Sequence, residues 1–261
     1  MDSFRVAVAC ESAAASLRFR AAKRWAVLAD GRHGSALDAF HAAIQLLPRL
    51  AMLGLDLPSR WQALASGSNG LAPAAAACAI KSGQYDKAVE LLEEGRAIFW
   101  AQALQLRTPM TDLHDVAPEL GEKLRSISLA LEQGSLRDVS LSFPNNTHRV
   151  ISMEQEASNF RRLNDEWLET LEEVRRLESF QDFLRPRRIS VLLGAAEIVP
   201  LVILNASGTA CAALILTSTG VQHVPLPDLT FGNVTQLVKL LRIPQSQRVE
   251  MVHFPRTIEH V

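Results

Sequence analysis

Three cysteines carry the most reactive side chains of this chain, and thiol catalysis would require one of them to lie beside a histidine. A catalytic thiolate needs such a base within hydrogen-bonding reach, at roughly 3 Å. Cys10 and Cys78 lie in alanine-rich segments of helical pattern, where we expect them to be packing residues. Cys211 lies in the apolar run ACAALIL, which predicts a buried, inert thiol in a strand. The best remaining pair is Cys211 with His223, since two antiparallel strands joined by a turn could bring them near each other.

No other pattern in the sequence predicts a reaction or a bound cofactor. The sequence contains no G-x-x-x-x-G-K-[ST] phosphate loop, no G-x-G-x-x-G dinucleotide motif and no H-E-x-x-H zinc pair. The acids of Glu93-Glu94 and of Glu172-Glu173 are adjacent, so on a helix they point in different directions and cannot act as a dyad. The three cysteines share no metal-ligand spacing. We therefore expect no catalytic residue, no cofactor and no metal site, and a chain that is not an enzyme.

Composition indicates an ordinary globular protein without a strong electrostatic preference. The 261 residues suffice for one large or two modest domains, and 48% hydrophobic against 21% charged residues can form a core. A net charge of -1 gives no reason to expect nucleic acid or an anionic membrane as partner. The N-terminus, MDSFRVAVACESAAAS, is a poor secretory signal, and an odd cysteine count suits a reducing compartment. We predict a cytoplasmic location and interpret the sequons at Asn145, Asn205 and Asn233 as chance matches.

The stretch from Pro200 to Pro227 predicts the strands of the chain. Its runs of Val, Ile, Leu and Thr are interrupted by Ser207-Gly208 and by Ser218-Thr219-Gly220, which is typical of an antiparallel meander. A membrane span is the rival interpretation, because residues 198–227 contain no Asp, Glu, Lys or Arg. The proline and glycine inside the stretch would free backbone groups that lipid cannot satisfy, and no basic cluster or aromatic belt flanks it. We therefore expect two or three strands.

Two segments of the first hundred residues share one pattern of glycine, alanine and large apolar residues. They are ADGRHGSALDAFHAAIQLLP at residues 29–48 and IKSGQYDKAVELLEEGRAIFW at residues 80–100. Glycine permits a tight turn between antiparallel helices, small residues let the helices approach, and a large residue fills the gap. The matching positions are Gly31 and Gly83, Ala36 and Ala88, Phe40 and Leu92, and Ala43 and Gly95.

This pattern resembles the turn and second helix of a tetratricopeptide repeat. The first helices match less well, because the expected small residue is Ala76 in one unit and Arg24 in the other. A generic array of helical hairpins is the alternative interpretation. In either case we expect Ala36, Phe40, Ala88 and Leu92 to be buried between helices.

Periodicity and capping residues predict the other helices. We expect a short helix from Pro58, one from Thr111 or Asp112 to Gln133, a loop at residues 134–149, and helices at residues 190–196 and 231–241. The cleanest pattern runs from Ile151 to Leu177 and places its apolar residues on one stripe: Met153, Ala157, Phe160, Leu163, Trp167, Leu171, Val174 and Leu177. The opposite face carries the pairs Arg162–Glu166 and Glu172–Arg176. We expect the stripe to pack on neighbouring helices, with a coiled coil to a partner as the alternative.

Several phrases together resemble fungal proteins in which tetratricopeptide-like helices precede a CHAT domain, a caspase- and separase-like module. The phrases are ALDAFHAAIQLLPRLAMLGLDLP, GQYDKAVELLEEGRAIFWAQALQLRTP, FLRP, PLVILNAS, CAALIL and GVQHVPLPDLT, and they fall between about residues 15 and 235. The resemblance implies a caspase-like α/β fold and a family similar to cysteine peptidases. In that family the histidine lies in a motif like H-F-A-C-H-G and the cysteine in a later segment like S-A-C, both beyond the meander.

This sequence contains neither motif. His253-Phe254 begins like the first one, but Pro255-Arg256-Thr257 follows in place of a small residue, Cys, His and Gly. His223 matches a family phrase that leads out of the meander and does not belong to the dyad. The resemblance therefore implies a CHAT-like domain that lacks its catalytic pair.

The expected fold class is multidomain α and α/β: a tetratricopeptide-like helical hairpin array followed by the first part of a caspase-like α/β domain. The expected division is a helical region at 1–145, a connecting helix at 146–185, a CHAT-like part at 186–243 and an unassigned tail at 244–261. We interpret the chain as a protein–protein interaction module whose CHAT domain is incomplete and inactive. Its repeats would bind a protein or peptide, its incomplete sheet would self-associate, and neither nucleic acid nor membrane would be a partner. The alternative is a fragment of a CHAT-family cysteine peptidase whose catalytic half is missing from this chain.

Overall fold

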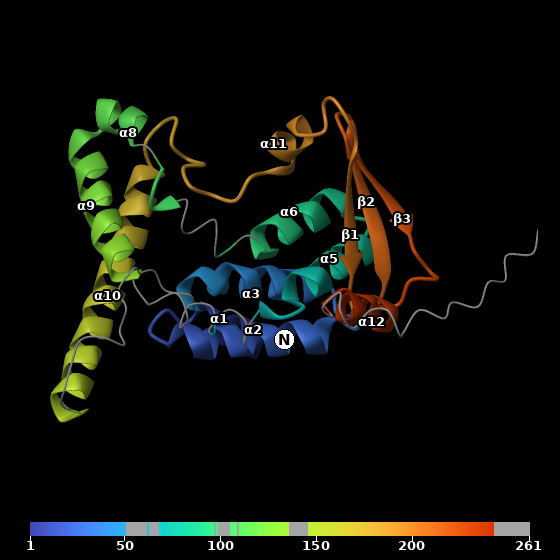
Figure 1. The fold of residues 1–261 in the computed structure, drawn as a ribbon, viewed down its shortest axis with the longest axis horizontal. Helices are drawn as coiled ribbons and strands as arrows, with labels where there is room; N and C mark the ends of the chain where they lie inside the picture. Colours follow the sequence, from blue (N-terminus) through green and yellow to red (C-terminus); the bar gives the residue numbers. More distant parts are fainter. Residues whose placement is uncertain are drawn as a thin grey trace, which may run out of the picture.

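The structure is a computed structural model that describes residues 1–50, 62, 68–96, 98, 105–108, 110–135 and 146–242. These ranges form helices and one small antiparallel sheet, which lies toward one end of the molecule (Figure 1). The elements are α1 (Asp2–Ala9), α2 (Ala15–Ala29), α3 (Ala36–Leu50), α5 (Leu71–Lys81), α6 (Tyr85–Arg96), α8 (Thr111–Val116), α9 (Pro118–Ser135), α10 (Asn146–Val174), α11 (Ile189–Gly194), β1 (Leu201–Ala206), β2 (Cys211–Thr217), β3 (Gly220–Pro225) and α12 (Phe231–Arg242). The helix expected from Pro58, the tail at 244–261 and His253 lie outside the described residues.

Two helical hairpins, α2–α3 and α5–α6, form the N-terminal part. Each hairpin turns at a glycine in the left-handed region, with φ +70° at Gly31 and +69° at Gly83. Most side chains avoid this conformation, which explains why the shared sequence pattern places glycine there. The predicted helical turns at Gly31 and Gly83 are therefore confirmed.

Small residues bring the paired helices into close contact. Ala43, Ala76 and Ala88 have no exposed surface, and the large residues Phe40 and Leu92 fill the space beside them. Ala36 is also buried, so all four residues expected between the helices are confirmed there. These contacts show a packed array of helical hairpins, and its membership of the tetratricopeptide class stays a prediction.

We expect Gly95→Ala to destabilise the protein although alanine is the better helix former. A Cβ at Gly95 would lie 2.5 Å from the Ala72 Cβ, so α5 and α6 would have to move apart. Overpacking of this kind costs about 1–3 kcal/mol, against a gain in helix propensity of about 1 kcal/mol. Thermal melting followed by circular dichroism measures the result. The matched control is Gly34→Ala, because nothing lies within 4 Å of a Cβ built there. A higher melting midpoint for Gly95→Ala would contradict the close approach.

The first helix of the first hairpin departs from the repeat pattern. Arg24, at the position expected to be small, is exposed, and the neighbouring Trp25 is buried instead. The Trp25 indole donates a hydrogen bond to the buried Ser35 hydroxyl at 3.0 Å. The buried face of α2 therefore contains the large side chain of Trp25, and the position expected to be small, Arg24, lies outside that face, which accounts for the weaker match.

The prediction of a single helix at residues 111–133 is wrong. The structure has α8 and α9 there, separated at Ala117, whose φ and ψ are -142° and 76°. Pro118 disfavours a helical conformation at the residue before it and has no N–H to donate, so it suits the first position of a new helix. The helix break could have been predicted from Pro118 alone.

The long helix α10 packs against α9 through its apolar stripe, as the sequence predicted. Trp167, Leu171 and Val174 are buried in a second hydrophobic cluster together with Leu113, Leu124, Ile127 and Leu131. The Trp167 indole donates to the buried Ser128 hydroxyl at 3.1 Å. The stripe is therefore a packing surface over these residues.

The limits of this helix and one of its ion pairs differ from expectation. It begins at Asn146, inside the expected loop, and ends at Val174, before the turns at residues 175–184. Glu172 pairs with Arg175 at 2.7 Å, one residue before the partner expected, because Arg175 also donates to the carbonyls of Phe183 and Leu184. Arg175 thus holds the chain that leads away from α10.

The hydrophobic clusters divide the described chain in a way that the sequence did not predict. The first cluster joins the hairpins to the sheet, since Ala196, Leu214 and Leu216 are buried with residues of α2, α3, α5 and α6. The second contains α8, α9, α10 and the turns that follow. Figure 1 shows the second group at the opposite end of the molecule from the sheet. Residues of α8 and α9, together with Leu106 and Met110, therefore pack with α10 although the sequence placed them with the N-terminal helices.

The predicted meander is confirmed in place of a membrane helix. Residues 201–225 form β1, β2 and β3, with antiparallel pairing in the order β1-β2-β3. Across the described ranges, no helix combines the length and the apolar character that a bilayer span would need.

Candidate interaction surface

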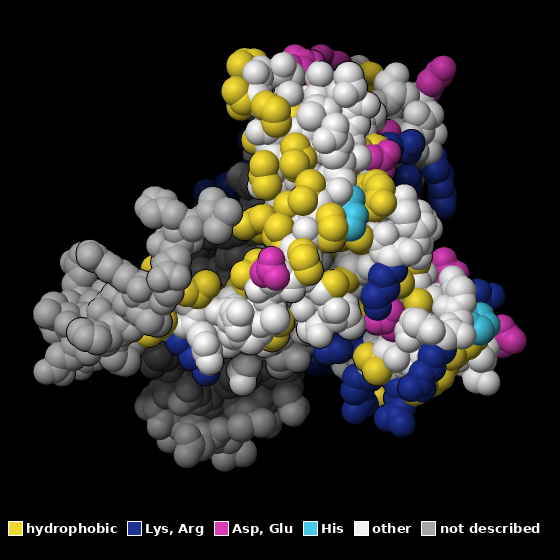
Figure 2. Space-filling model, turned by 90° about the vertical axis from the view of Figure 1, so that its right-hand side faces the viewer, with side chains coloured by type: hydrophobic (Ala, Val, Ile, Leu, Met, Phe, Trp, Pro, Cys, Tyr) yellow, Lys and Arg dark blue, Asp and Glu magenta, His cyan; other side chains and the backbone are white. Residues whose placement is uncertain are grey.

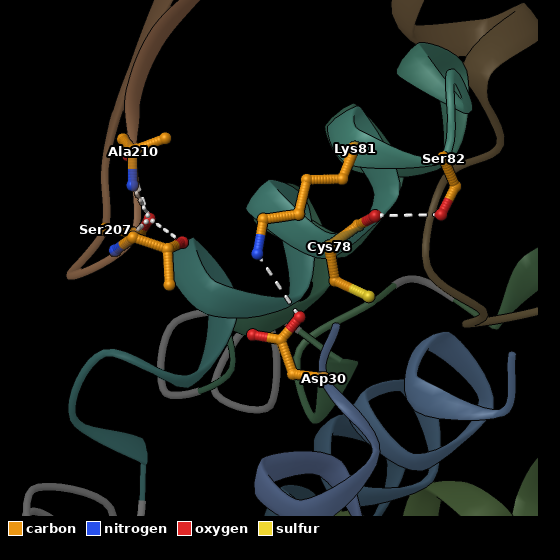
Figure 3. A network of polar contacts seen from close by, with 7 residues as sticks. Asp30, Cys78, Lys81, Ser82, Ser207 and Ala210 are labelled. Atoms are coloured by element: carbon orange, nitrogen blue, oxygen red, sulfur yellow. Dashed lines mark hydrogen bonds and ion pairs between the residues drawn. The ribbon is translucent and has the colours of Figure 1, made fainter. Parts of the chain in front are cut away.

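Two short turns fix the register of the three strands. Between β1 and β2 the Ser207 hydroxyl accepts the Ala210 N–H at 3.1 Å and donates to the Ala210 carbonyl at 2.8 Å (Figure 3). Between β2 and β3 the Thr217 hydroxyl donates to the Gly220 carbonyl at 3.1 Å. Both turns lie where Ser, Thr and Gly predicted them. The hydroxyl side chains form hydrogen bonds to nearby backbone groups, which take the place of hydrogen bonds between strands.

The register sorts the side chains into two faces, since neighbouring residues of a strand point to opposite sides. One face contains the rows Ile203–Leu214–His223 and Leu201–Leu216–Val221, which we call the inner face. The other contains the rows Leu204–Ala213–Val224 and Val202–Ile215–Gln222, which we call the outer face. Both faces are mostly apolar.

Helices α5 and α6 cover the inner face. Leu214 is fully buried, and the His223 ring stacks on the Tyr85 ring of α6 with centroids 5.2 Å apart. The side-chain amide of Asn205 donates to the Pro73 carbonyl of α5 at 3.0 Å. Asn205 is itself buried, which agrees with a chance sequon. The sheet therefore forms part of the first cluster.

The outer face is exposed at the apolar side chains of its two edge strands, β1 and β3, whereas Ala213 on the central strand is buried. Val202 is 59% exposed and Leu204 60%, and Val224 is also exposed. Figure 2 views the side of the molecule that carries the sheet and shows hydrophobic side chains gathered in a band, with charged groups mostly at its borders. Contiguous apolar surface of this kind marks interaction sites in soluble proteins. The outer face is the candidate surface.

Helix α12, which follows the sheet, adds further exposed apolar residues. Thr230 caps its start by accepting the Asn233 N–H at 3.1 Å, and the helix runs as predicted from Phe231. Phe231, Leu237 and Leu241 are exposed along it. A helix in a protein gains most of its stability by burying its apolar face. The apolar side chains of α12 are therefore available for burial against a partner.

The register separates the one cysteine–histidine pair that the sequence left open. Cys211 begins β2 and points to the same side of the sheet as Ala213 and Ile215, which is the outer face. His223 lies opposite Leu214 and points to the inner face. The two side chains therefore belong to opposite faces of the sheet. Because His223 is stacked on Tyr85, a thiolate–imidazole pair cannot form between them without breaking the sheet.

The other two cysteines differ from each other in their environments. Cys78 is buried in α5, and burial raises the pKa of its thiol, so the packing role expected for it is confirmed. Figure 3 shows it beside Asp30, which pairs with Lys81 at 3.4 Å. Cys10, expected as a packing residue on a helix, is instead exposed just after α1. The Ser12 hydroxyl, at 3.3 Å from the Cys10 sulfur, is the main group that lowers the pKa of this thiol.

A cavity of about 700 Å³ lies between α8, α9 and the chain before them. Its walls carry both charge signs, including Arg107, Asp115, Arg125 and Glu132, and Arg107 pairs with Glu132 at 2.6 Å. Sequence reasoning missed it because the cavity depends on the break between α8 and α9. Its mixed lining does not favour one class of ligand.

Within the described ranges, no group of three or more His, Cys, Asp or Glu side chains is arranged to hold a metal ion. Comparison with known proteins adds no assignment: no family model matches the chain, and neither the curated proteins nor the solved structures give a match. The outer face of the sheet is therefore the feature that carries a functional argument.

Proposed function

We propose that this chain is a protein-interaction module in which the outer face of the sheet binds the same face of a second copy. The exposed apolar side chains of Val202, Leu204 and Val224 carry this proposal. Folding of one chain leaves these side chains in water. Covering them would yield a free energy of about 25 cal/mol per Å² of apolar surface removed from water. A partner that covers them supplies the stabilisation that the single sheet lacks.

A second copy suits this face because of its charge. No Asp, Glu, Lys or Arg occurs between residues 198 and 227, so two outer faces can meet without desolvating a charge or opposing like charges. A net charge of -1 on the whole chain adds little repulsion between copies. A symmetric dimer uses one patch twice, which an apolar and uncharged patch permits.

The resemblance to the opening of a CHAT domain agrees with this proposal. A meander preceded by α11 and followed by α12 fits the first part of a caspase-like domain, in which a larger sheet and its helices would cover such a face. The separation of Cys211 from His223 supports an inactive role for the part of the chain described. We therefore propose an interaction function and no peptidase activity.

Val202→Glu tests the proposal in the full chain. Sedimentation velocity over a range of protein concentrations is expected to show a dimer for the unchanged chain. In Val202→Glu the buried charge should raise the dimer dissociation constant by a factor of about ten or more, and a tenfold change corresponds to about 1.4 kcal/mol. The matched control is Val27→Glu, since Val27 is 71% exposed but lies on α2. Val27→Glu should leave dimerisation unchanged.

Two results would overturn the proposed dimer. One is that the unchanged chain stays monomeric at roughly tens of micromolar, a concentration at which weak but specific dimers form. The other is equal weakening by both glutamate variants, which would indicate association that does not use the outer face. If the unchanged chain is monomeric, a different protein becomes the better candidate for the partner.

A further inference from the structure

A basic segment links the second hydrophobic cluster to the sheet. Residues 185–188, Arg-Pro-Arg-Arg, have no helix or strand conformation and are exposed along their whole length. Arg188 itself has extended φ and ψ values of -74° and 158°. Ser190 follows at the start of α11, and its side chain is exposed.

Arg187 and Arg188 stand three and two residues before the Ser190 hydroxyl, and no other Ser or Thr of the sequence has arginines at both positions. Protein kinases with acidic substrate grooves select this arrangement, because carboxylates pair with each guanidinium and align the hydroxyl with the nucleotide. We propose that Ser190 is the phosphorylation site of an arginine-directed protein kinase.

Both arginines are available for such a contact. Arg188 pairs with Asp182 at 2.8 Å, but the two side chains are 67% and 62% exposed. An exposed pair of this kind contributes little stability, so a kinase carboxylate can replace Asp182. Pro186 has no N–H to donate and favours an extended chain, which suits binding along a groove.

Other serines that follow an arginine by three residues serve as internal comparisons. Ser35 and Ser128 have Arg32 and Arg125 at that position, but both are buried and accept hydrogen bonds from tryptophan indoles. Ser179 is exposed but directly follows an acid, Glu178, and has a left-handed φ of +77°. The remaining two, Ser140 and Ser152, have a single arginine and are competing sites in the test.

The transfer needs a kinase and a magnesium-bound nucleoside triphosphate, both supplied from outside this chain. The Ser190 oxygen forms a bond to the γ-phosphorus, and the bond from that phosphorus to the β,γ-bridging oxygen breaks. The nucleoside diphosphate leaves, and the hydroxyl proton passes to a carboxylate of the kinase. The product carries a charge of about -1.5 to -2 at this position near neutral pH.

That charge would lie beside the contact that holds α11 on α6. The Ile189 N–H donates to the Glu90 carboxylate of α6 at 3.0 Å, and Lys87 pairs with the same carboxylate at 3.2 Å. A phosphate on the next residue opposes the charge of Glu90. We expect phosphorylation to loosen α11 from α6 and so to expose the half-buried residues Ile189, Leu192 and Leu193, which pack on the first cluster.

The test incubates the full chain with a purified arginine-directed serine kinase and magnesium ATP, and locates phosphate by tandem mass spectrometry. We expect phosphate at Ser190 and its loss in Ser190→Ala. When Arg187 and Arg188 are both replaced by alanine, we expect the initial rate of phosphorylation to fall by a factor of about ten or more. All of these side chains are exposed, so the variants should melt like the unchanged chain. An unmodified Ser190, or a rate unaffected by loss of both arginines, would overturn the proposal.

Hydrogen exchange tests the consequence for α11. Amides of residues 189–194 should exchange faster after phosphorylation, whereas in Glu90→Gln the effect should be much smaller. Glutamine keeps an oxygen that can accept the Ile189 N–H but removes the negative charge. Unchanged exchange after full phosphorylation, or the same increase in Glu90→Gln, would show that the phosphate does not act through Glu90.

Discussion

Replacing Ala88 with arginine is expected to lower the free energy of unfolding by about 4 kcal/mol or more. Ala88 has no exposed surface in the contact between α5 and α6. The longer side chain would force the helices apart, and its guanidinium cannot lose its charge to escape the burial cost. Such a loss is a large fraction of the roughly 5–15 kcal/mol by which domains are stable.

Urea denaturation followed by far-ultraviolet circular dichroism measures the effect of Ala88→Arg. The control is Glu93→Arg, which places the same side chain at an exposed position of α6 and should change stability by less than about 0.5 kcal/mol. If the two variants have the same urea midpoint, α6 does not pack on α5 through Ala88, and the hairpin array would be wrong.

Replacing Trp167 with alanine is expected to cost about 3–5 kcal/mol in the second cluster. Trp167 is buried between α10 and α9, and its indole is the donor to the buried Ser128 hydroxyl. The substitution would leave a cavity and would also remove that hydrogen bond. The second cluster should therefore unfold at a lower urea concentration than the first.

Loss of helix signal alone would not show which cluster unfolds, so hydrogen exchange at α9 and at α5 is the readout. Faster exchange is expected in α9 and not in α5, because the two helices belong to different clusters. Glu169→Ala, an exposed change on the same helix, should leave both unchanged. If Trp167→Ala left α9 as protected as before, the stripe of α10 would be better explained as a surface for a partner.

Features that depend on a few neighbouring residues could be predicted from the sequence. The strand meander followed from apolar runs cut by Ser, Thr and Gly, and the hairpin turns followed from Gly31 and Gly83. Both are local, because a turn residue fixes the chain reversal whatever packs on it later. The same reasoning would have separated α8 from α9, had Pro118 been used as a helix start.

Features that depend on a register or on a distant partner could not be predicted. The pattern of α2 did not show that Trp25 would be buried and Arg24 exposed, because Ser35, the hydrogen-bond partner of Trp25, lies across the turn. Cys10 was expected to pack on a helix, yet the helix ends at Ala9 and leaves the thiol exposed. Glu172 pairs with Arg175 because Arg175 is held by the Phe183 and Leu184 carbonyls.

The sequence by itself determined which segments form helices and strands over most of the described chain, and that Cys211 and His223 flank a turn. Only the tertiary structure decided that they lie on opposite faces, and that α5 and α6 cover one face while Val202, Leu204 and Val224 on the other stay exposed. It also decided that Ser190 is exposed while Ser35 and Ser128 are buried. The reason is physical: apolar alternation and arginine spacing are properties of neighbouring residues, whereas burial depends on which distant helix packs against them.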